Sequence, residues 1–191
     1  MNEELKERIV QEAADLFNAK GYRNVTLSEL ASRLGISKKT LYLSFRGKED
    51  IAEAVLGLTM RAIADTIAEQ RKRDAGPLAR LRDVFLGIKQ EMMKLHPVFL
   101  EDIQKAAPAL WKRVEAFRGR QLLFVEELLL QAKEAGEIRD LDIRLVSVIL
   151  LDTIQRLIRP DFAAQHGVTM PHVADTLFSL FLEGLRNNPE K

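Results

Sequence analysis

Two short helical patterns joined by a glycine-containing turn constrain the fold of this chain more than any other feature of its sequence. Thr26, with Glu29 three residues later, forms a capping box at the start of the first pattern. That pattern stops after barely two turns at Gly35, a residue that readily takes the left-handed conformation ending a helix. Ser37 then offers a side-chain cap for a second short helix, expected over residues 38–45. The sequence therefore predicts two short helices on either side of a tight turn.

A longer amphipathic pattern precedes the two short ones. It runs from residue 3 to residue 20, stops at Gly21, and places its apolar side chains on one side at helical spacing: Leu5, Ile9, Ala13, Leu16 and Phe17. A supporting helix followed by two short helices across a glycine turn is the helix-turn-helix arrangement, which places its last helix in a DNA groove. Residues 38–45 are therefore the candidate recognition helix.

The candidate recognition helix has two faces of different chemistry. Leu41 and Phe45 are four residues apart and form an inner, apolar face. The outer face carries two lysines, a tyrosine and a leucine: Lys38, Lys39, Tyr42 and Leu43. Lysine can donate to guanine O6 and N7, tyrosine can stack or donate to phosphate, and leucine can contact the thymine methyl group. We therefore expect the outer face to bind the major groove of DNA.

The distribution of charge agrees with this expectation. The whole chain has a formal net charge of only +1. Between residues 20 and 48, however, seven basic residues stand against the single acid Glu29, a local charge of +6. Such an excess is typical of a phosphate-binding surface, although a solvated basic face gives the same count.

Helical patterns also account for the rest of the chain, and no segment has the alternation typical of a strand. Proline and glycine residues divide it into blocks expected at about 48–76, 78–95, 97–106, 109–135, 142–159 and 171–187. The sequence therefore predicts an all-α protein with an N-terminal helix-turn-helix segment.

The last two blocks carry more apolar surface than one chain can cover. Residues 143–158 are apolar on more than one face, and the block at 171–187 is rich in large apolar groups. A symmetric dimer, in which the same two helices of each subunit pack together, would cover both surfaces. We therefore predict a homodimer formed through the helices at about 142–159 and 171–187.

The segment KGYRNVTLSELASRLGISKKTLYLSFRGKEDI, residues 20–51, resembles the N-terminal motif of the TetR family (tetracycline-repressor-like) of transcriptional regulators. The motif covers the first quarter of the chain, and the remainder agrees with the family in layout. The resemblance implies an all-α homodimer with a three-helix DNA-binding domain at residues 1–47 and a larger helical ligand-binding and dimerisation domain at residues 48–191. It also implies a palindromic operator, and it favours a repressor that a small, largely apolar molecule releases from DNA.

The resemblance also assigns roles to individual residues. It makes Lys38, Lys39 and Tyr42 the contacts in the groove. Leu43 departs from the residues that relatives often carry at its position, so its expected contact with a thymine methyl group rests on its own apolar side chain. The resemblance places four further side chains at phosphates: Thr26, Thr40, Ser44 and Lys48. Two alternatives remain open, because Tyr42 could pack against the first helix and Thr26 is already expected to serve as a cap.

The sequence contains no constellation typical of an enzyme, a metal site or a cofactor site. Its three histidines, His96, His166 and His172, are far apart and lie in no metal-binding or triad pattern. We therefore expect no catalytic residue, metal or cofactor.

A site for an apolar ligand needs only an apolar cavity with a few polar groups, and such sites often lie between the helices of a bundle. The candidate ligand-binding residues are Met92, Phe99, Trp111, Phe117, Phe124, Asp152 and Gln155. The apolar members could equally be plain core, and Asp152 and Gln155 could bridge the dimer or reach solvent.

The chain has no cysteine and no apolar run of the roughly 18 residues that a membrane span requires. A cytoplasmic protein without a membrane partner is therefore expected. The competing interpretation is a helical small-molecule carrier or interaction protein without DNA binding. The basic, outward-facing third helix argues against that competitor.

Overall fold

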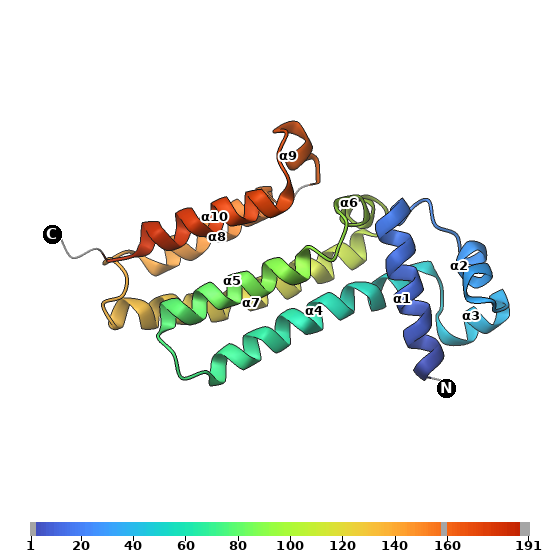
Figure 1. The fold of residues 1–191 in the computed structure, drawn as a ribbon, viewed down its shortest axis with the longest axis horizontal. Helices are drawn as coiled ribbons and strands as arrows, with labels where there is room; N and C mark the ends of the chain where they lie inside the picture. The colour runs from blue at the N-terminus through green and yellow to red at the C-terminus, as the bar shows by residue number, and fades with distance from the viewer. Residues whose placement is uncertain (1–2, 158–159, 188–191) are drawn as a thin grey trace. The chain divides into compact units, whose positions relative to one another are not determined.

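The computed structural model describes residues 3–157 and 160–187, and these residues form ten helices without a strand (Figure 1). The predicted all-α class is confirmed. The helices are α1 (Glu3–Lys20), α2 (Leu27–Leu34), α3 (Lys38–Ser44), α4 (Lys48–Lys72), α5 (Pro77–Met92), α6 (Pro97–Ala106), α7 (Pro108–Glu134), α8 (Ile143–Leu157), α9 (Pro160–Gln165) and α10 (Met170–Leu185). A single isolated bridge joins Ile138 to Arg186. None of the described helices is both long and apolar enough to cross a membrane.

Proline residues begin several of the helices. Pro77, Pro97 and Pro108 each stand at the first position of a helix, where their fixed φ and missing N–H cost nothing. The same rule explains an element that the sequence did not predict. The blocks expected from the sequence include none that begins at Pro160, yet Pro160 begins the six-residue α9. Residues 158 and 159, at the end of the block expected over 142–159, lie outside the described residues.

The described chain divides into two compact units. The first comprises the residues up to Arg61 together with Lys94–Glu115, and the second comprises Ala62–Met93 with the residues from Ala116 onward. The first part of α4 and the whole of α6 thus belong to the same unit as the three N-terminal helices. The functional boundary expected after residue 47 stays a prediction.

The core of the first unit is formed by side chains of α1, α2, α3 and α6. Five residues of α1 are buried, in the spacing of one helix face: Ile9, Val10, Ala13, Leu16 and Phe17. The Phe17 ring stacks on that of Phe99 in α6, with ring centroids 5.2 Å apart. Leu30 of α2 and Leu41 of α3 are also almost fully buried. Helices α2 and α6 pack against α1, and α3 packs against α2.

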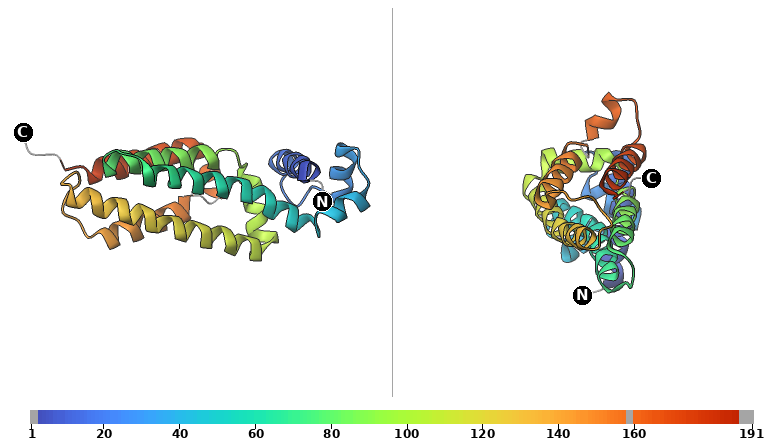
Figure 2. Two further views of the ribbon diagram at one scale, coloured as in Figure 1. Left: turned by 90° about the horizontal axis from the view of Figure 1, so that it is seen from below. Right: turned by 90° about the vertical axis from the view of Figure 1, so that its left-hand side faces the viewer.

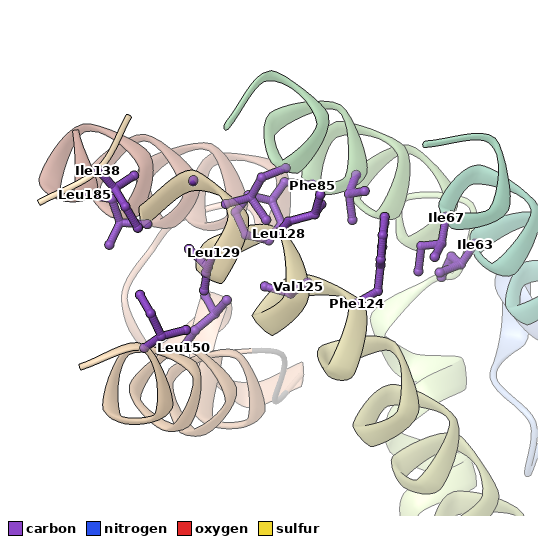
Figure 3. Close-up of a cluster of buried hydrophobic side chains, with 14 residues drawn as sticks. Ile63, Ile67, Phe85, Phe124, Val125, Leu128, Leu129, Ile138, Leu150 and Leu185 are labelled. Atoms are coloured by element: carbon purple, nitrogen blue, oxygen red, sulfur yellow. The ribbon is translucent and has the colours of Figure 1, made fainter. Parts of the chain in front are cut away.

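The core of the second unit is centred on α7. Figure 3 shows side chains of neighbouring helices converging on it, with Ile63 and Ile67 of α4 towards Phe124 and Leu150 of α8 beside Leu129. Helix α10 lies along α5 (Figure 2), and there Phe85 stacks on Phe178 with centroids 4.5 Å apart. The second unit is therefore a helical bundle held together mainly by apolar packing.

Candidate nucleic-acid interface

The turn between α2 and α3 has the caps that the sequence predicts. The Thr26 hydroxyl accepts the Glu29 backbone N–H at 3.1 Å, which fixes the start of α2. Gly35 ends α2 with φ 65° and ψ 29°, and the next N–H, of Ile36, returns to the Ala31 carbonyl at 3.0 Å. The Ser37 hydroxyl then accepts the Thr40 N–H at 3.0 Å at the start of α3. Local hydrogen bonds thus set the direction in which α3 leaves the turn.

Helix α3 separates its inner and outer faces as expected. Leu41 is buried, and so is Phe45, which directly follows the helix. Tyr42 is 55% exposed and Leu43 is 72% exposed. Lys38 and Lys39 are exposed on the same outer side. More than half of the Tyr42 surface is open to solvent, so its phenol is available to a partner. The outer face therefore presents two ammonium groups, a phenol and a branched alkyl group to solvent.

The hydroxyl groups predicted at phosphates are in different situations. Thr26 is exposed although its oxygen accepts a capping hydrogen bond. The Thr40 hydroxyl is half-buried and lies 2.9 Å from the Ser37 hydroxyl. Ser44, at the end of α3, is half-buried. Phosphate contacts from these three residues stay predictions.

Lys48 has a role that the sequence did not reveal. Its Nζ donates to the backbone carbonyl oxygens of Tyr22 at 2.9 Å, Val25 at 2.8 Å and Arg23 at 3.3 Å. It also lies 4.4 Å from the centroid of the Tyr22 ring. Burial lowers the pKa of the Lys48 ammonium, and the nearby Asp102 carboxylate offsets part of that shift. An ammonium has three donors, so all of them are used within the protein.

We therefore expect Lys48→Met to act on stability rather than on phosphate binding. Methionine keeps much of the side-chain stem but leaves the loop carbonyls without their charged donor, which should lower the free energy of unfolding by about 1–3 kcal/mol. The salt dependence of DNA binding should stay as in the wild type. Urea unfolding and salt-titrated DNA binding check both points. Lys38→Met is the matched control: because Lys38 is exposed, its replacement should flatten the salt dependence of DNA binding and leave the free energy of unfolding unchanged. A flatter salt dependence for Lys48→Met would mean that Lys48 contacts a phosphate after all.

Asp102 is a second residue that the sequence analysis missed. It lies on the buried side of α6, is 3% exposed, and accepts hydrogen bonds from the backbone N–H and the Nε of Arg23 at 2.9 and 2.6 Å. In the sequence, the feature that could have identified Asp102 is a carboxylate on the same helix face as the apolar residues Phe99 and Ile103. Its partner, 79 residues away in the chain, could not be read from that pattern.

The structure distributes the predicted ligand-binding residues over both units. Met92, Phe117 and Phe124 belong to the core cluster of the second unit, where Phe124 is buried and the other two are half-buried. Phe99 and Trp111 belong to the first unit, and Phe99 stacks on Phe17 in its core. Asp152 and Gln155 are exposed on α8. Ligand roles for these seven residues stay predictions.

Within the part of the chain that the structure describes, no group of three or more histidine, cysteine, aspartate or glutamate residues is placed to hold a metal ion.

Comparisons with known proteins agree with this geometry. Residues 9–55 match the family model for "Bacterial regulatory proteins, tetR family". An uncharacterised helix-turn-helix regulator of Bacillus subtilis, YvaF, is 25% identical over 189 residues, covering 97% of this chain and 98% of its own. The crystal structure of the TetR-family regulator PfmR from Thermus thermophilus superposes with a TM-score of 0.71 at 26% identity, covering 94% of this chain and 100% of its own.

A third relative shares the fold at lower identity. The structure of FadR from Bacillus subtilis in complex with stearoyl-CoA matches with a TM-score of 0.68 and 19% identity, over 94% of this chain and 99% of its own. The matched family model spans α2 and α3, whose caps and exposed basic face are described above. Residues 9–55 therefore form the DNA-binding segment of the TetR family of bacterial regulatory proteins, and the chain as a whole resembles regulators of that family.

Proposed function

We propose that this protein is a homodimeric repressor that leaves its operator when a small, largely apolar molecule binds its second unit. The observation that carries the proposal is the outer face of α3, where Lys38, Lys39, Tyr42 and Leu43 are all exposed. Each subunit would place α3 in one half-site of a palindromic operator, with half-sites roughly 34–36 Å apart. Such a protein acts in the cytoplasm and needs no catalytic residue.

Helices α8 and α10 supply the proposed dimer interface. On α8, Leu145, Val148 and Ile149 are each more than half exposed and follow the i, i+3, i+4 spacing of one helix face. Asp152 is exposed seven residues after Leu145 and extends the same face, which favours an interface role over a ligand role. On α10, Leu180 is 70% exposed. A second copy of the chain would cover these groups by symmetry.

The proposed effector is a molecule with a long acyl or similarly apolar body. Large apolar side chains around the core of the second unit are only partly buried: Met92, Phe117, Ile154, Phe178 and Phe181. Stearoyl-CoA, bound by the FadR relative, has such a body. A nearly complete release from DNA needs the effector to prefer one state by about 5.5 kcal/mol. Helix α4 begins at Lys48, just after α3, and continues into the second unit, so a shift of α4 would change the separation of the two α3 helices.

Replacing Lys39 or Tyr42 with alanine should weaken sequence-specific DNA binding. Loss of a base contact should cost roughly 1–3 kcal/mol and relax specificity, whereas loss of a phosphate contact should flatten the log-log salt slope by about 0.9. Fluorescence anisotropy in a salt series measures both effects on duplexes that the wild-type protein enriches from a random-sequence pool. If the wild-type protein enriches nothing, the proposal is wrong and a helical carrier becomes the better interpretation.

The same complex tests the effector class. Stearoyl-CoA should release the labelled duplex, whereas coenzyme A without an acyl chain should not, because only the acyl chain adds apolar surface to bury. Equal release by both compounds would contradict an apolar effector.

A further inference from the structure

The loop of residues 21–25, between α1 and α2, is held by charged groups on two sides. On one side the Asp102 carboxylate of α6 binds the backbone N–H and the Nε of Arg23. On the other side the Lys48 ammonium of α4 binds three loop carbonyl oxygens, including that of Arg23. The loop leads directly into Thr26, the cap of α2. The loop therefore connects α6 and α4 to the start of the helix-turn-helix.

The Asp102 side chain is built into this contact. It is 4% exposed, and each of its two oxygens accepts one hydrogen bond from Arg23. A buried carboxylate is stable only when it is paired and hydrogen-bonded, so loop and helix stabilise one another. The backbone approaches closely as well, since a Cβ added at Gly21 would lie 2.6 Å from the Asp102 Oδ2.

Two further contacts fasten the segment around α6 to α1. The Asn18 side chain donates to the Lys94 carbonyl oxygen and accepts the His96 backbone N–H, both at 2.9 Å. The Phe17 and Phe99 rings stack in the same region. A displacement of α6 must therefore either carry the loop with it or break several hydrogen bonds.

Along the chain, α6 lies between two helices that contribute to the second unit. Lys94–Glu115 belongs to the first unit, but the chain enters that segment from α5 and leaves it through α7. Both α5 and α7 contribute to the core of the second unit, where the effector is proposed to bind. The segment that carries Asp102 is therefore continuous along the chain, at both ends, with helices of that core.

We propose that Asp102 is a positioning residue for operator binding. Through its two bonds to Arg23 it ties the loop, and with it α2 and α3, to α6, so that a change at α6 reaches the recognition helix. This inference rests on the proposed DNA-binding function. Because such coupling is reciprocal, DNA bound at α3 must also affect α6.

The test compares the full-length wild-type protein with Asp102→Asn on a duplex that the wild type enriches from a random-sequence pool. Asparagine keeps the shape of the side chain but turns one acceptor into a donor, so one bond to Arg23 is lost. Affinity for the duplex should fall roughly 2- to 30-fold, the range found for residues that couple two sites. The duplex should slow amide hydrogen exchange in α6 of the wild type, and this protection should shrink in the variant.

Two further variants separate coupling from simple loss of stability. Ile103→Val shortens a fully buried neighbour in α6 and leaves both Asp102–Arg23 hydrogen bonds in place, so affinity and α6 protection should both stay at wild-type levels. Arg23→Lys keeps the charge and the backbone hydrogen bond, and it should give a smaller loss in the same direction even if Asp102→Asn does not fold.

Two results would overturn the inference: no DNA-induced protection of α6 in the wild type, or full protection in both Asp102→Asn and Arg23→Lys. A wild type that enriches no duplex would instead remove the proposed function, and this inference with it.

Discussion

Gly21→Ala is expected to lower the free energy of unfolding by about 2–5 kcal/mol, for two separate reasons. Gly21 has φ +79°, a left-handed conformation that costs a residue with a Cβ roughly 1–2 kcal/mol. The new methyl group would also lie 2.6 Å from the Asp102 Oδ2 and 2.9 Å from the Val98 Cγ1. Room for it requires α6 or the loop to move, which breaks hydrogen bonds to a buried carboxylate at a cost of about 1–3 kcal/mol.

Gly35→Ala is the matched control. Gly35 has φ +65°, but no atom lies within 4 Å of the position that its Cβ would take. Its replacement should therefore cost only the backbone term, roughly 1–2 kcal/mol. Urea unfolding of both variants at one protomer concentration measures the difference, since dimer stability depends on concentration. If both variants lose the same free energy of unfolding, the close approach of α6 to the loop does not contribute to the cost of Gly21→Ala.

These two glycines also show what the sequence could predict. The role of Gly35 depends on neighbours within a few residues, so the capping box, the glycine stop and the Ser37 cap predict the turn between α2 and α3. Gly21 was predicted as a helix stop, and φ +79° agrees. Its second constraint comes from Val98 and Asp102, which lie more than 70 residues further along the chain. No periodicity or local motif carries that information.

The predicted residues of the DNA-binding interface also differ in whether their environment depends on local sequence or on distant parts of the chain. The exposure of Lys38, Lys39, Tyr42 and Leu43 follows from helical geometry once Leu41 and Phe45 are taken as the inner face. Lys48 begins α4 in agreement with the pattern, yet its ammonium binds the loop because of tertiary packing. Phe99 and Phe117 are equally aromatic in sequence, and only the fold assigns them to different units.

Ile149→Glu is expected to convert the proposed dimer into monomers at concentrations where the wild type is dimeric. A symmetric interface contains every residue twice, so one substitution removes two apolar groups and introduces two carboxylates. Burying an ionised carboxylate costs several kcal/mol, and the lost apolar burial adds about 1.5–3 kcal/mol for each fully buried side chain. The dimer Kd should therefore rise by at least roughly a thousandfold, which corresponds to about 4 kcal/mol. Sedimentation equilibrium measures the dimer Kd directly.

Leu123→Glu on α7 is a demanding control, because exposure alone would predict the opposite ranking. Leu123 is 68% exposed and Ile149 only 53%. The surroundings decide the matter. Leu123 has Arg120, Glu126 and Glu127 one turn away, whereas Ile149 has Leu145 one turn away and shares with it and Val148 the exposed apolar face of α8. A solvated leucine gains nothing from a partner subunit, so Leu123→Glu should leave the dimer Kd unchanged. If it dissociates the dimer and Ile149→Glu does not, the subunits meet through α7. Operator affinity should follow the dimer in either case, because two half-sites one turn apart can be occupied together only by linked recognition helices.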